Sequence, residues 1–452
     1  MQWLQDKLNT FSSILWGEYL LIPLLAIVGI YLTIGLQAVP WRQIPLAFHT
    51  LWQSRKNTSH IEGDISPFQA LMTALSATVG TGNIAGVATA IYFGGPGAIF
   101  WMWIIALFGM ATKYAEAVLA VSYREKDALG NYVGGPMYYI RNGLGNNWRW
   151  MASSFAFFAM FAAFGIGNMV QSHSVADEIY SSFNIPTMIT GAVMAILAGL
   201  VIIGGVKRIA QVAANLVPFM AITYILAALA IVLLNIEKLP DAISLIVTSA
   251  FTGSAASGGF LGASIWMAIR WGCARGIFSN EAGLGSAPIA HAAAQTNDPV
   301  KQGMVAMLGT FIDTIIICSL TAFVIILTGT WDSGLKGVSM SSQAFSTGLY
   351  GYGGYVVSFG LVLFAFTTIL GWSYYGERSA EYLFGTKIIK PYRVLWIIAI
   401  FIGSIMKLEL VWTFADVFNG LMALPNLIAL LLLSPVVFSK TRQYFNNKKS
   451  KW

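Results

Sequence analysis

Residues 73–90, with the sequence TALSATVGTGNIAGVATA, decide the fold of this chain. They lie inside an apolar segment long enough to cross a membrane, yet they include three glycines, several hydroxyl side chains and the amide of Asn83. Glycine is a poor helix former, and backbone groups in hydrocarbon must be hydrogen-bonded within the protein. Such a stretch is tolerated only where it is buried in protein or lines a water-filled cavity. The sequence therefore predicts an interrupted helix inside a membrane protein.

Composition supports this interpretation. The 452 residues are 57% hydrophobic and 10% charged, with a mean hydropathy of +0.69, whereas about 25% of residues are charged in soluble domains. The net charge of +7 reflects basic residues in loops beside apolar segments, a pattern that reports topology rather than nucleic-acid binding. We expect one all-α polytopic transmembrane domain over 1–452, with a membrane core at 14–438 and a basic tail at 439–452.

Apolar runs of about 20 residues predict about eleven transmembrane helices. The basic tail places the C-terminus in the cytoplasm, and the odd number of spans places the N-terminus outside. Most basic residues then fall on the cytoplasmic side, and only Lys7, Lys238, Lys336 and Lys407 lie outside. The first span follows Lys7 without a cleavage site, so we expect it to be retained. The predicted spans are 15–36, 66–93, 97–121, 150–171, 184–204, 212–234, 257–292, 302–327, 352–384, 392–408 and 412–438.

The seventh span contains a second irregular stretch. Residues 272–288 are glycine-rich and carry Arg275 and Glu281 in the middle of the span. The pattern Asn-x-Ala-Gly occurs in both irregular stretches, at 83–86 and at 280–283, five spans apart. Interrupted segments at corresponding positions of two halves indicate a transporter site. We therefore predict a 5+5 inverted repeat of spans 2–6 and 7–11, preceded by one extra span.

Several motifs carry a family resemblance. The stretches SATVGTGNIAG (76–86), GGPG (94–97), GGPMYY (134–139) and RGIFSNEAGLGSAP (275–288), with Gly371-Trp372, resemble the alanine or glycine:cation symporter family over about 14–438. The run at 79–83 is also similar to the broken first core helix of neurotransmitter:sodium symporters, which share the leucine-transporter fold. The resemblance implies that fold, sodium as the coupling ion, and a small neutral amino acid as substrate.

The first interruption offers donors for a carboxylate. A helix that restarts near Gly80 exposes N–H groups at its positive end, which suits an anion. Gly80, Thr81, Gly82 and Asn83 are the predicted substrate contacts there. Asn83 has an alternative role as a helix cap or an interhelical bond without ligand contact.

The resemblance adds contacts from other spans. Gln171 is expected to meet the substrate, the alternative being a helix-end residue that faces water. Thr368 and Trp372 lie four residues apart, hence on one helix face, and are expected to wall a small pocket, although Trp372 has packing as an alternative role. The second interruption contributes the remaining predicted contacts: Ile277, Phe278, Ser279, Asn280 and Gly283.

Sodium is a hard cation that prefers oxygen ligands, which unwound carbonyls and hydroxyls supply. The resemblance points to the backbone region at Ser76, Thr78 and Val79, and to the hydroxyls of Thr367 and Thr368. The alternative for these two threonines is ordinary back-bonding within their helix.

Ionisable groups inside spans are functional candidates because their burial is costly. We expect Glu281 and Asp313 each to pair with Arg270 or Arg275, and for Asp313 two alternatives remain, facing the cation or carrying a proton. Two further pairs of residues are assigned no transport role. Lys113 and Glu116 read as an i, i+3 pair near the cytoplasmic end of the third span, and Cys273 and Cys318 as packing residues.

No nucleotide-binding or metalloprotease motif is present, so an enzyme is not expected. The prediction is an inner-membrane symporter that couples inward sodium flow to the uptake of a small neutral amino acid, alanine or glycine, by alternating access. We expect no organic cofactor and no nucleic-acid partner. The alternatives are a proton-coupled transporter that uses Asp313 and, from a different class, a passive channel.

Overall fold

The computed structural model describes residues 2–17, 20–55, 62–255, 258–406 and 409–449. The topological assignments of Lys56, Lys407 and Lys451 lie outside these residues. Nearly all of the described chain is helical, and its only strands form a short antiparallel hairpin, β1 (Glu125–Lys126) with β2 (Tyr132–Val133). The fold is therefore all-α, as predicted.

Each predicted span coincides with a helix or with a series of helical segments. In the first half these are α2 (Leu21–Gly35), α5 (Pro67–Thr78) with α6 (Val87–Gly94), α7 (Gly97–Ser122), α9 (Arg149–Phe164) with α10 (Val170–Phe183), α11 (Thr187–Ile202) and α12 (Gly205–Leu234). In the second half they are α14 (Ile265–Asn280) with α15 (Ala287–Ala292), α16 (Pro299–Thr310) with α17 (Ser319–Leu327), α19 (Gly353–Phe384), α20 (Ile389–Ile405) and α21 (Glu409–Lys449).

By length and apolar composition, seven helices of the described chain are able to cross a membrane. The bent pair α5 and α6 makes an eighth, whereas α2 and α11 are shorter apolar helices. The protein is thus a multi-pass membrane protein, and the number of eleven spans stays a prediction.

Several helices lie where the sequence suggested connectors. Three of them, α1 (Gln2–Leu15), α13 (Leu239–Thr252) and α18 (Gly337–Gly348), are shorter than the apolar runs of about 20 residues that predict spans. The short helices α3 (Val39–Arg42), α4 (Ile44–Gln53) and α8 (Pro136–Leu144) lie in the segments 37–65 and 122–149 between predicted spans. The fourth span was also predicted to end too early. It continues through α10 to Phe183, because the polar residues after Gln171 cover one face of a helix rather than form a loop.

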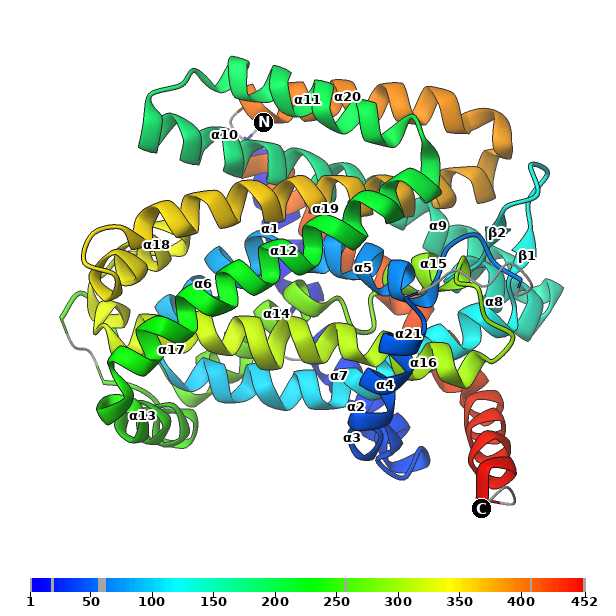
Figure 1. Cartoon of the computed structure of the whole chain (residues 1–452), viewed down its shortest axis with the longest axis horizontal. Coiled ribbons are helices and arrows are strands. Elements are labelled where there is room, and N and C mark those ends of the chain that lie inside the picture. Colours follow the sequence, from blue (N-terminus) through cyan, green and yellow to red (C-terminus); the bar gives the residue numbers. More distant parts are fainter. Residues whose placement is uncertain (1, 18–19, 56–61, 256–257, 407–408, 450–452) are drawn as a thin grey trace.

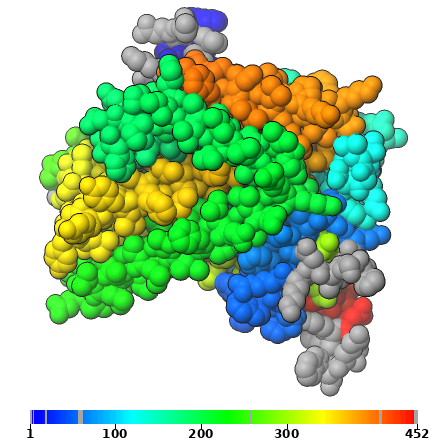
Figure 2. Space-filling view, turned by 45° about the horizontal axis from the view of Figure 1, so that its top comes forward, coloured from blue at the N-terminus to red at the C-terminus, as the bar shows by residue number. Residues whose placement is uncertain are grey.

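The interrupted helices lie in the middle of the molecule, as Figure 1 shows for α5, α6 and α14. Helix α7 packs against α14 and α16, and α19 packs against α5, α9 and α12. Figure 2 shows α12 and α20, in green and orange, on the outer surface. Large apolar side chains of these outer helices, such as Leu226 at 60% and Leu395 at 56% exposure, face outward as expected for contact with lipid. The two irregular stretches are thereby enclosed.

Candidate functional site

The first break follows α5. A capping box at Ser66 and Gln69 starts this helix, and it ends at Val79, whose ψ of 96° is extended. A π-helical segment, η1 (Gly82–Gly86), then leads into α6 at an angle of 53° to α5. The amide of Gly80 donates to Asn83 Oδ1 at 2.9 Å. In a continuous helix this amide would bond the carbonyl of Ser76, so the break removes the usual donor from that carbonyl.

Close packing against α19 requires a glycine at position 80. A Cβ at this position would lie 2.6 Å from Thr368 Oγ1 of α19, closer than any real contact. The missing side chain lets α19 approach the broken backbone. Helix α19 is therefore held against the first break.

The second break separates α14 from α15. Glu281 follows α14 in the left-handed region with a φ of 57°, and Gly283 and Gly285 also have positive φ. The side-chain oxygen of Asn280 accepts a hydrogen bond from the amide of Ala282 at 2.9 Å. An asparagine of the repeated pattern thus bonds a backbone amide in each break.

Both asparagines also hold the same neighbouring segment, the π-helical η5 (Phe311–Cys318). Asn83 Nδ2 donates to Asp313 Oδ1 at 2.7 Å, and Asn280 Nδ2 donates to Thr314 Oγ1 at 3.0 Å. The repeated Asn-x-Ala-Gly pattern therefore has one structural meaning at two places. Asn83 combines a local cap with an interhelical bond, the two roles given above as its alternative.

Asp313 is fully buried and lies at the centre of a polar cluster. Its Oδ2 accepts hydrogen bonds from Ser279 Oγ and Thr314 Oγ1, each at 2.8 Å, in addition to the Asn83 bond. Cys318 Sγ lies 3.3 Å from both Asn83 Nδ2 and Ser279 Oγ. Cys318 is thus part of a polar cluster, where the sequence predicted only packing.

The predicted pairing of Glu281 and Asp313 with arginines is wrong. The ion pairs of the described residues include neither carboxylate. Glu281 instead accepts hydrogen bonds from Trp372 Nε1 at 2.9 Å and from Ser286 Oγ at 2.5 Å. Arg270 and Arg275 point to the other side of α14, where both guanidinium groups lie near the ring of Trp271.

The predicted pair of Lys113 and Glu116 also differs. Both side chains are buried in the interior rather than near a helix end. Lys113 attracts Glu116, Glu281 and Asp313 electrostatically, but no ion pair of the described residues joins it to Glu116. Glu116 accepts hydrogen bonds from Asn426 Nδ2 at 2.7 Å and from the amide of Gly285 at 3.2 Å. It holds the second break against α21.

A small pocket lies between the first break, α14 and α19. Its volume of about 10 Å³ suits a single water molecule, so in this structure the pocket is too small for an amino acid. Eight predicted site residues line it: Thr78, Gly80, Thr81, Gly82, Gln171, Phe278, Thr368 and Trp372. Ala77, Ile166 and Glu281 complete the lining.

The sequence did not select Ile166 or Glu281 for the pocket. Ile166 lies in a π-helical segment, η3 (Gly165–Met169), and the two glycines of that segment were the available signal. Glu281 stands out in the sequence as an intramembrane carboxylate next to a break, but its predicted arginine partner is wrong.

Gln171 has an unpaired acceptor in this pocket. Its Nε2 donates to the carbonyl of Ile166 at 2.9 Å and to Thr81 Oγ1 at 3.3 Å. Its Oε1 is buried and has no hydrogen-bond partner among the described residues. The side chain is 2% exposed, so the alternative that it faces water is wrong. A buried acceptor without a donor is costly, and a ligand N–H group would satisfy it.

The other predicted residues lie outside this lining. Asn83, Ser279 and Asn280 belong to the adjoining Asp313 cluster. Ile277 is buried but absent from the lining, and a Cβ at Gly283 would meet Leu25 and Leu427, away from the pocket.

The predicted sodium ligands do not all face the same space. Thr367 Oγ1 donates to the carbonyl of Phe364 and lies 3.5 Å from Met220 Sδ of α12, whereas Thr368 faces Gly80. Both threonines bond the carbonyl of Phe364, as their alternative predicted. Ser76 lies on the face of α5 that meets Gly371, and Val79 is buried at the end of the helix.

Phe278 separates the pocket from a larger cavity. The same ring lines a space of about 220 Å³ together with Arg270, Arg275 and Asp416. It also stacks on Trp412, with ring centroids 6.4 Å apart. One aromatic side chain is therefore the partition on this side, which the predicted topology places outside.

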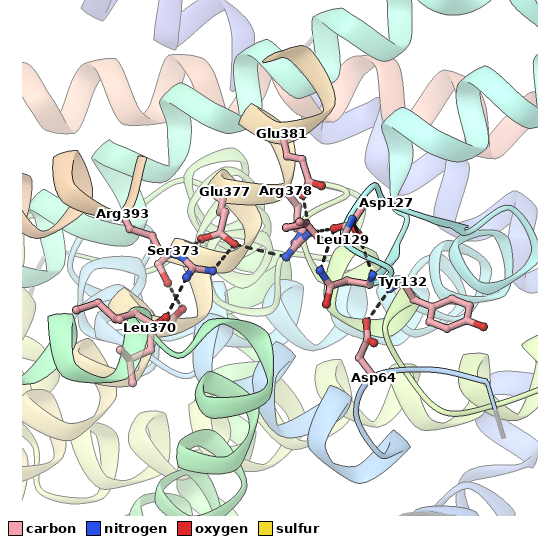
Figure 3. Close-up of polar contacts among 12 residues, drawn as sticks. Asp64, Asp127, Leu129, Tyr132, Leu370, Ser373, Glu377, Arg378, Glu381 and Arg393 are labelled. Carbon is pink, nitrogen blue, oxygen red and sulfur yellow. Dashed lines mark hydrogen bonds and ion pairs between the residues drawn. The ribbon is translucent and has the colours of Figure 1, made fainter. Parts of the chain in front are cut away.

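Beyond the pocket, toward the C-terminal end of α19, lies a network of charges (Figure 3). Arg378 Nη1 lies 3.1 Å from Asp127 Oδ2 and 2.5 Å from Glu381 Oε2. Glu377 bonds Arg393 at 2.6 Å and lies 3.5 Å from Arg378. This network ties α19 to α20 and to the β1–β2 hairpin.

Local hydrogen bonds within the hairpin keep the carboxyl group of Asp127 ionised for its contact with Arg378. Burial acts to raise the pKa of Asp127, but hydrogen bonds from Asn131 and from the amide of Leu129 lower it below its ordinary value. Asp127 therefore remains charged at neutral pH, and its attraction for Arg378 persists until the pH falls below the usual range of a carboxyl group.

Comparisons with known proteins agree with this geometry. The model of the sodium:alanine symporter family matches residues 1–452. The chain is 50% identical over 448 residues to the sodium/alanine symporter AgcS of Methanococcus maripaludis, covering 98% of this chain and 97% of the relative. It is 40% identical over 451 residues to the probable sodium/glutamine symporter GlnT of Bacillus subtilis, covering 99% and 92%.

The structure of MhsT in complex with L-phenylalanine is similar with a TM-score of 0.56 at 13% identity, over 84% of this chain and 99% of that one. This likeness shows the leucine-transporter fold. The chain is a transporter and not an enzyme. It belongs to the sodium:alanine symporter family.

Proposed function

We propose that this protein is a sodium-coupled symporter that carries a small neutral amino acid, alanine or glycine, into the cell by alternating access. The observation that supports it most is the position of the pocket. It lies at the first helix break, where the backbone N–H groups of a new helical segment begin. The buried acceptor Gln171 Oε1 lines it, and the cluster around the buried carboxylate of Asp313 adjoins it. These three features match the three charges of an amino-acid zwitterion and a cation.

The substrate carboxylate is proposed to bind at Gly80, Thr81 and Gly82, in the stretch that leads into η1. The amide of Gly80 already donates to Asn83 Oδ1, so the N–H groups of Thr81 and Gly82 are the proposed donors. Helix N-termini stabilise anions through free N–H groups and the helix dipole. The ammonium group is proposed to donate to Gln171 Oε1, which has no other partner among the described residues. Binding then satisfies an acceptor that the closed pocket leaves unpaired.

We propose that two aromatic side chains, Trp372 and Phe278, limit the size of the substrate side chain. Trp372 and Phe278 line the pocket, and the indole of Trp372 is fixed by its bond to Glu281. The closed volume leaves no space for a side chain, so Phe278 has to move outward for binding. A methyl group or a hydrogen needs the smallest movement, which favours alanine and glycine.

For sodium we propose two positions. The first is the predicted one, at Ser76, Thr78, Val79, Thr367 and Thr368. Thr368 lies against the first break, but Thr367 faces α12. The second is the Asp313 cluster, whose oxygens come from Asp313, Ser279 and Thr314. The second position offers a formal negative charge, which the first does not.

Coupling to protons is the competing proposal, and one observation favours it. Asp313 is a buried carboxylate that forms no ion pair with a described residue, so a proton is also able to neutralise it. A passive channel is disfavoured, because the pocket of about 10 Å³ is lined almost entirely by buried residues, whereas a channel needs a continuous lined pore.

Uptake of labelled alanine into proteoliposomes separates these proposals. An inward sodium gradient should drive accumulation, and removal of sodium should abolish it. Uptake driven equally well by a pH gradient without sodium would overturn sodium coupling in favour of protons. Currents that do not saturate with alanine would indicate a channel. A sodium-dependent uptake assay over a panel that includes glycine and glutamine tests the substrate.

In membrane orientation, we propose that the N-terminus is outside and the C-terminus is in the cytoplasm of the cell membrane. The charge network of α19 then faces the cytoplasm, and the Phe278 partition faces outward. Protease protection of tags at the two ends in right-side-out vesicles checks this orientation.

A further inference from the structure

A third space shares no lining residue with the candidate substrate pocket or with the cavity at Phe278. It has a volume of about 200 Å³ and is formed where α2 ends, where α3 begins, and by the last turns of α21. Figure 1 shows α3 and the C-terminal end of α21 at the same edge of the molecule. Its polar lining residues are Gln37, Arg42, Gln43, Thr441, Arg442 and Asn446.

The cavity carries positive charge without compensation. Arg42 and Arg442 both line it, and the lining contains no aspartate or glutamate. Neither arginine is joined to a carboxylate in the ion pairs of the described residues. Two guanidinium groups that line one space together with amide side chains suit a phosphate group.

The wall of this cavity has an unusual backbone. Gln37 and Ala38 follow α2 with φ values of 52° and 57°, a left-handed conformation that is unfavourable for residues other than glycine. This turn reverses the chain at the end of α2, so that Gln37 and Arg42 line the same cavity. Backbone strain of this kind is often found at ligand sites.

An exposed apolar surface leads to the cavity. Ile27, Ile30 and Ile34 lie on one face of α2 with exposures between 39% and 72%. On α21, Ile428 and Leu432 are likewise exposed, at 39% and 47%. The two helices are in contact, since Tyr31 OH lies 3.1 Å from Ser434 Oγ and the ring of Tyr31 lies 5.8 Å from that of Phe438.

The apolar surface and the cavity are continuous. Phe438 lines the cavity and packs directly on Gly35. The position also matches the boundary of the membrane, because the apolar part of α21 gives way to the basic residues Lys440 and Arg442 there.

From these features we propose that the cavity binds the phosphate headgroup of an anionic phospholipid. Its acyl chains lie along the exposed faces of α2 and α21. Basic pockets between transmembrane helices bind such headgroups. A phospholipid explains both the uncompensated arginines and the apolar surface, whereas free phosphate explains only the arginines.

The test measures lipid binding to the purified full chain in detergent after lipid removal. Phosphatidylglycerol, phosphatidylcholine with the same acyl chains, and inorganic phosphate are titrated separately. We expect phosphatidylglycerol to bind and to raise the thermal unfolding temperature, and the other two to bind at least ~10-fold more weakly. Equal binding of phosphatidylcholine, or equally tight binding of inorganic phosphate, would overturn the proposal.

Matched variants locate the site. The double variant Arg42→Gln, Arg442→Gln should weaken phosphatidylglycerol binding on the order of 30-fold, because each basic residue near an anionic lipid contributes about a factor of five. The control Lys387→Gln, Lys390→Gln removes the same charge at exposed positions that do not line the cavity and should bind within about twofold of the parent chain. If both double variants lose affinity equally, net charge and not the cavity is responsible, and the proposal is wrong.

A conservative variant distinguishes loss of the binding site from misfolding of the protein. Arg42→Lys with Arg442→Lys keeps both charges but loses the bidentate geometry, so its affinity should fall between the parent chain and the glutamine variant. Parent-like affinity in the glutamine variant, with both proteins monodisperse on gel filtration, contradicts the site.

Discussion

The two breaks use the same pattern for different chemistry. In the first, Asn83 bonds the amide of Gly80 and holds Asp313, and neutral groups line the pocket. In the second, Asn280 bonds the amide of Ala282 and holds Thr314, but the carboxylate of Glu281 enters the pocket. The asparagine in each break stabilises a backbone that has left the helix. The residues around it determine what the break can bind.

This comparison teaches that the repeat preserves architecture and not function. The Nδ2 of Asn83 donates to a carboxylate, whereas the Nδ2 of Asn280 donates to a hydroxyl. Hydrogen bonds to charged groups contribute about 1.5–3 kcal/mol, compared with about 0.5–1.5 kcal/mol for neutral pairs. The two asparagines should therefore differ in their contribution to transport.

The largest effect is expected for Asn83→Ala. This variant leaves the amide of Gly80 and the carboxylate of Asp313 each without one partner, and should reduce sodium-dependent alanine uptake by at least ~100-fold. Initial rates in proteoliposomes measure it, with gel filtration as the check on folding. Near-normal kinetics in a folded variant would remove Asn83 from the site.

The second-largest effect is expected for Asp313→Asn. The amide keeps the size of the side chain but loses the negative charge, so the sodium concentration for half-maximal uptake should rise by about 10–30-fold. Uptake at varied sodium and fixed alanine provides this value. An unchanged sodium dependence, together with a lost response to a pH gradient, would assign Asp313 to protons instead.

Asn280→Ala tests the comparison directly. Its lost bonds are to neutral partners, so alanine uptake should fall only by about tenfold. Asn235→Ala is the control, since Asn235 bonds the carbonyl of Ile231 at the end of α12, away from the site, and should retain parent-like uptake. A loss as large as that of Asn83→Ala would show that the two breaks contribute equally.

Trp372→Ala should have the smallest effect on alanine itself. Removing the indole enlarges the pocket and frees Glu281 of one hydrogen bond, so alanine should be transported within about tenfold of the parent rate. Bulkier amino acids should gain relative to alanine in a competition assay. Unchanged size preference would leave Trp372 with a packing role only.

Much of this arrangement was predictable because membrane burial makes polar backbone informative. Glycines and hydroxyls at 76–86 and 272–288 mark the breaks, and the Asn-x-Ala-Gly match paired them correctly. Eight predicted residues line one pocket. Seven of them come from the two breaks and from the face of α19 that carries Thr368 and Trp372, whereas Gln171 on α10 was indicated only by the family resemblance.

The partners of the charges were not predictable in the same way. Charge complementarity suggested arginine for Glu281 and Asp313, but the faces of α14 decide the pairing, and Arg275 points to Asp416. The π-helical segments also shift side chains by an amount that a spacing of 3.6 residues does not anticipate. Asp313 and Thr314 therefore meet the two asparagines without any signal in the sequence.

Helix α19 links the pocket directly to the charge network. It runs unbroken from Gly353 to Phe384 and carries Thr368 at the pocket and Arg378 in the charge network. Ten residues of α-helix span about 15 Å, so a tilt of about 10° around Thr368 displaces Arg378 by about 2.6 Å. A displacement of that size directed away from Asp127 would nearly double the 3.1 Å separation of Arg378 from Asp127. One continuous helix therefore connects the pocket with the charge network that holds the hairpin.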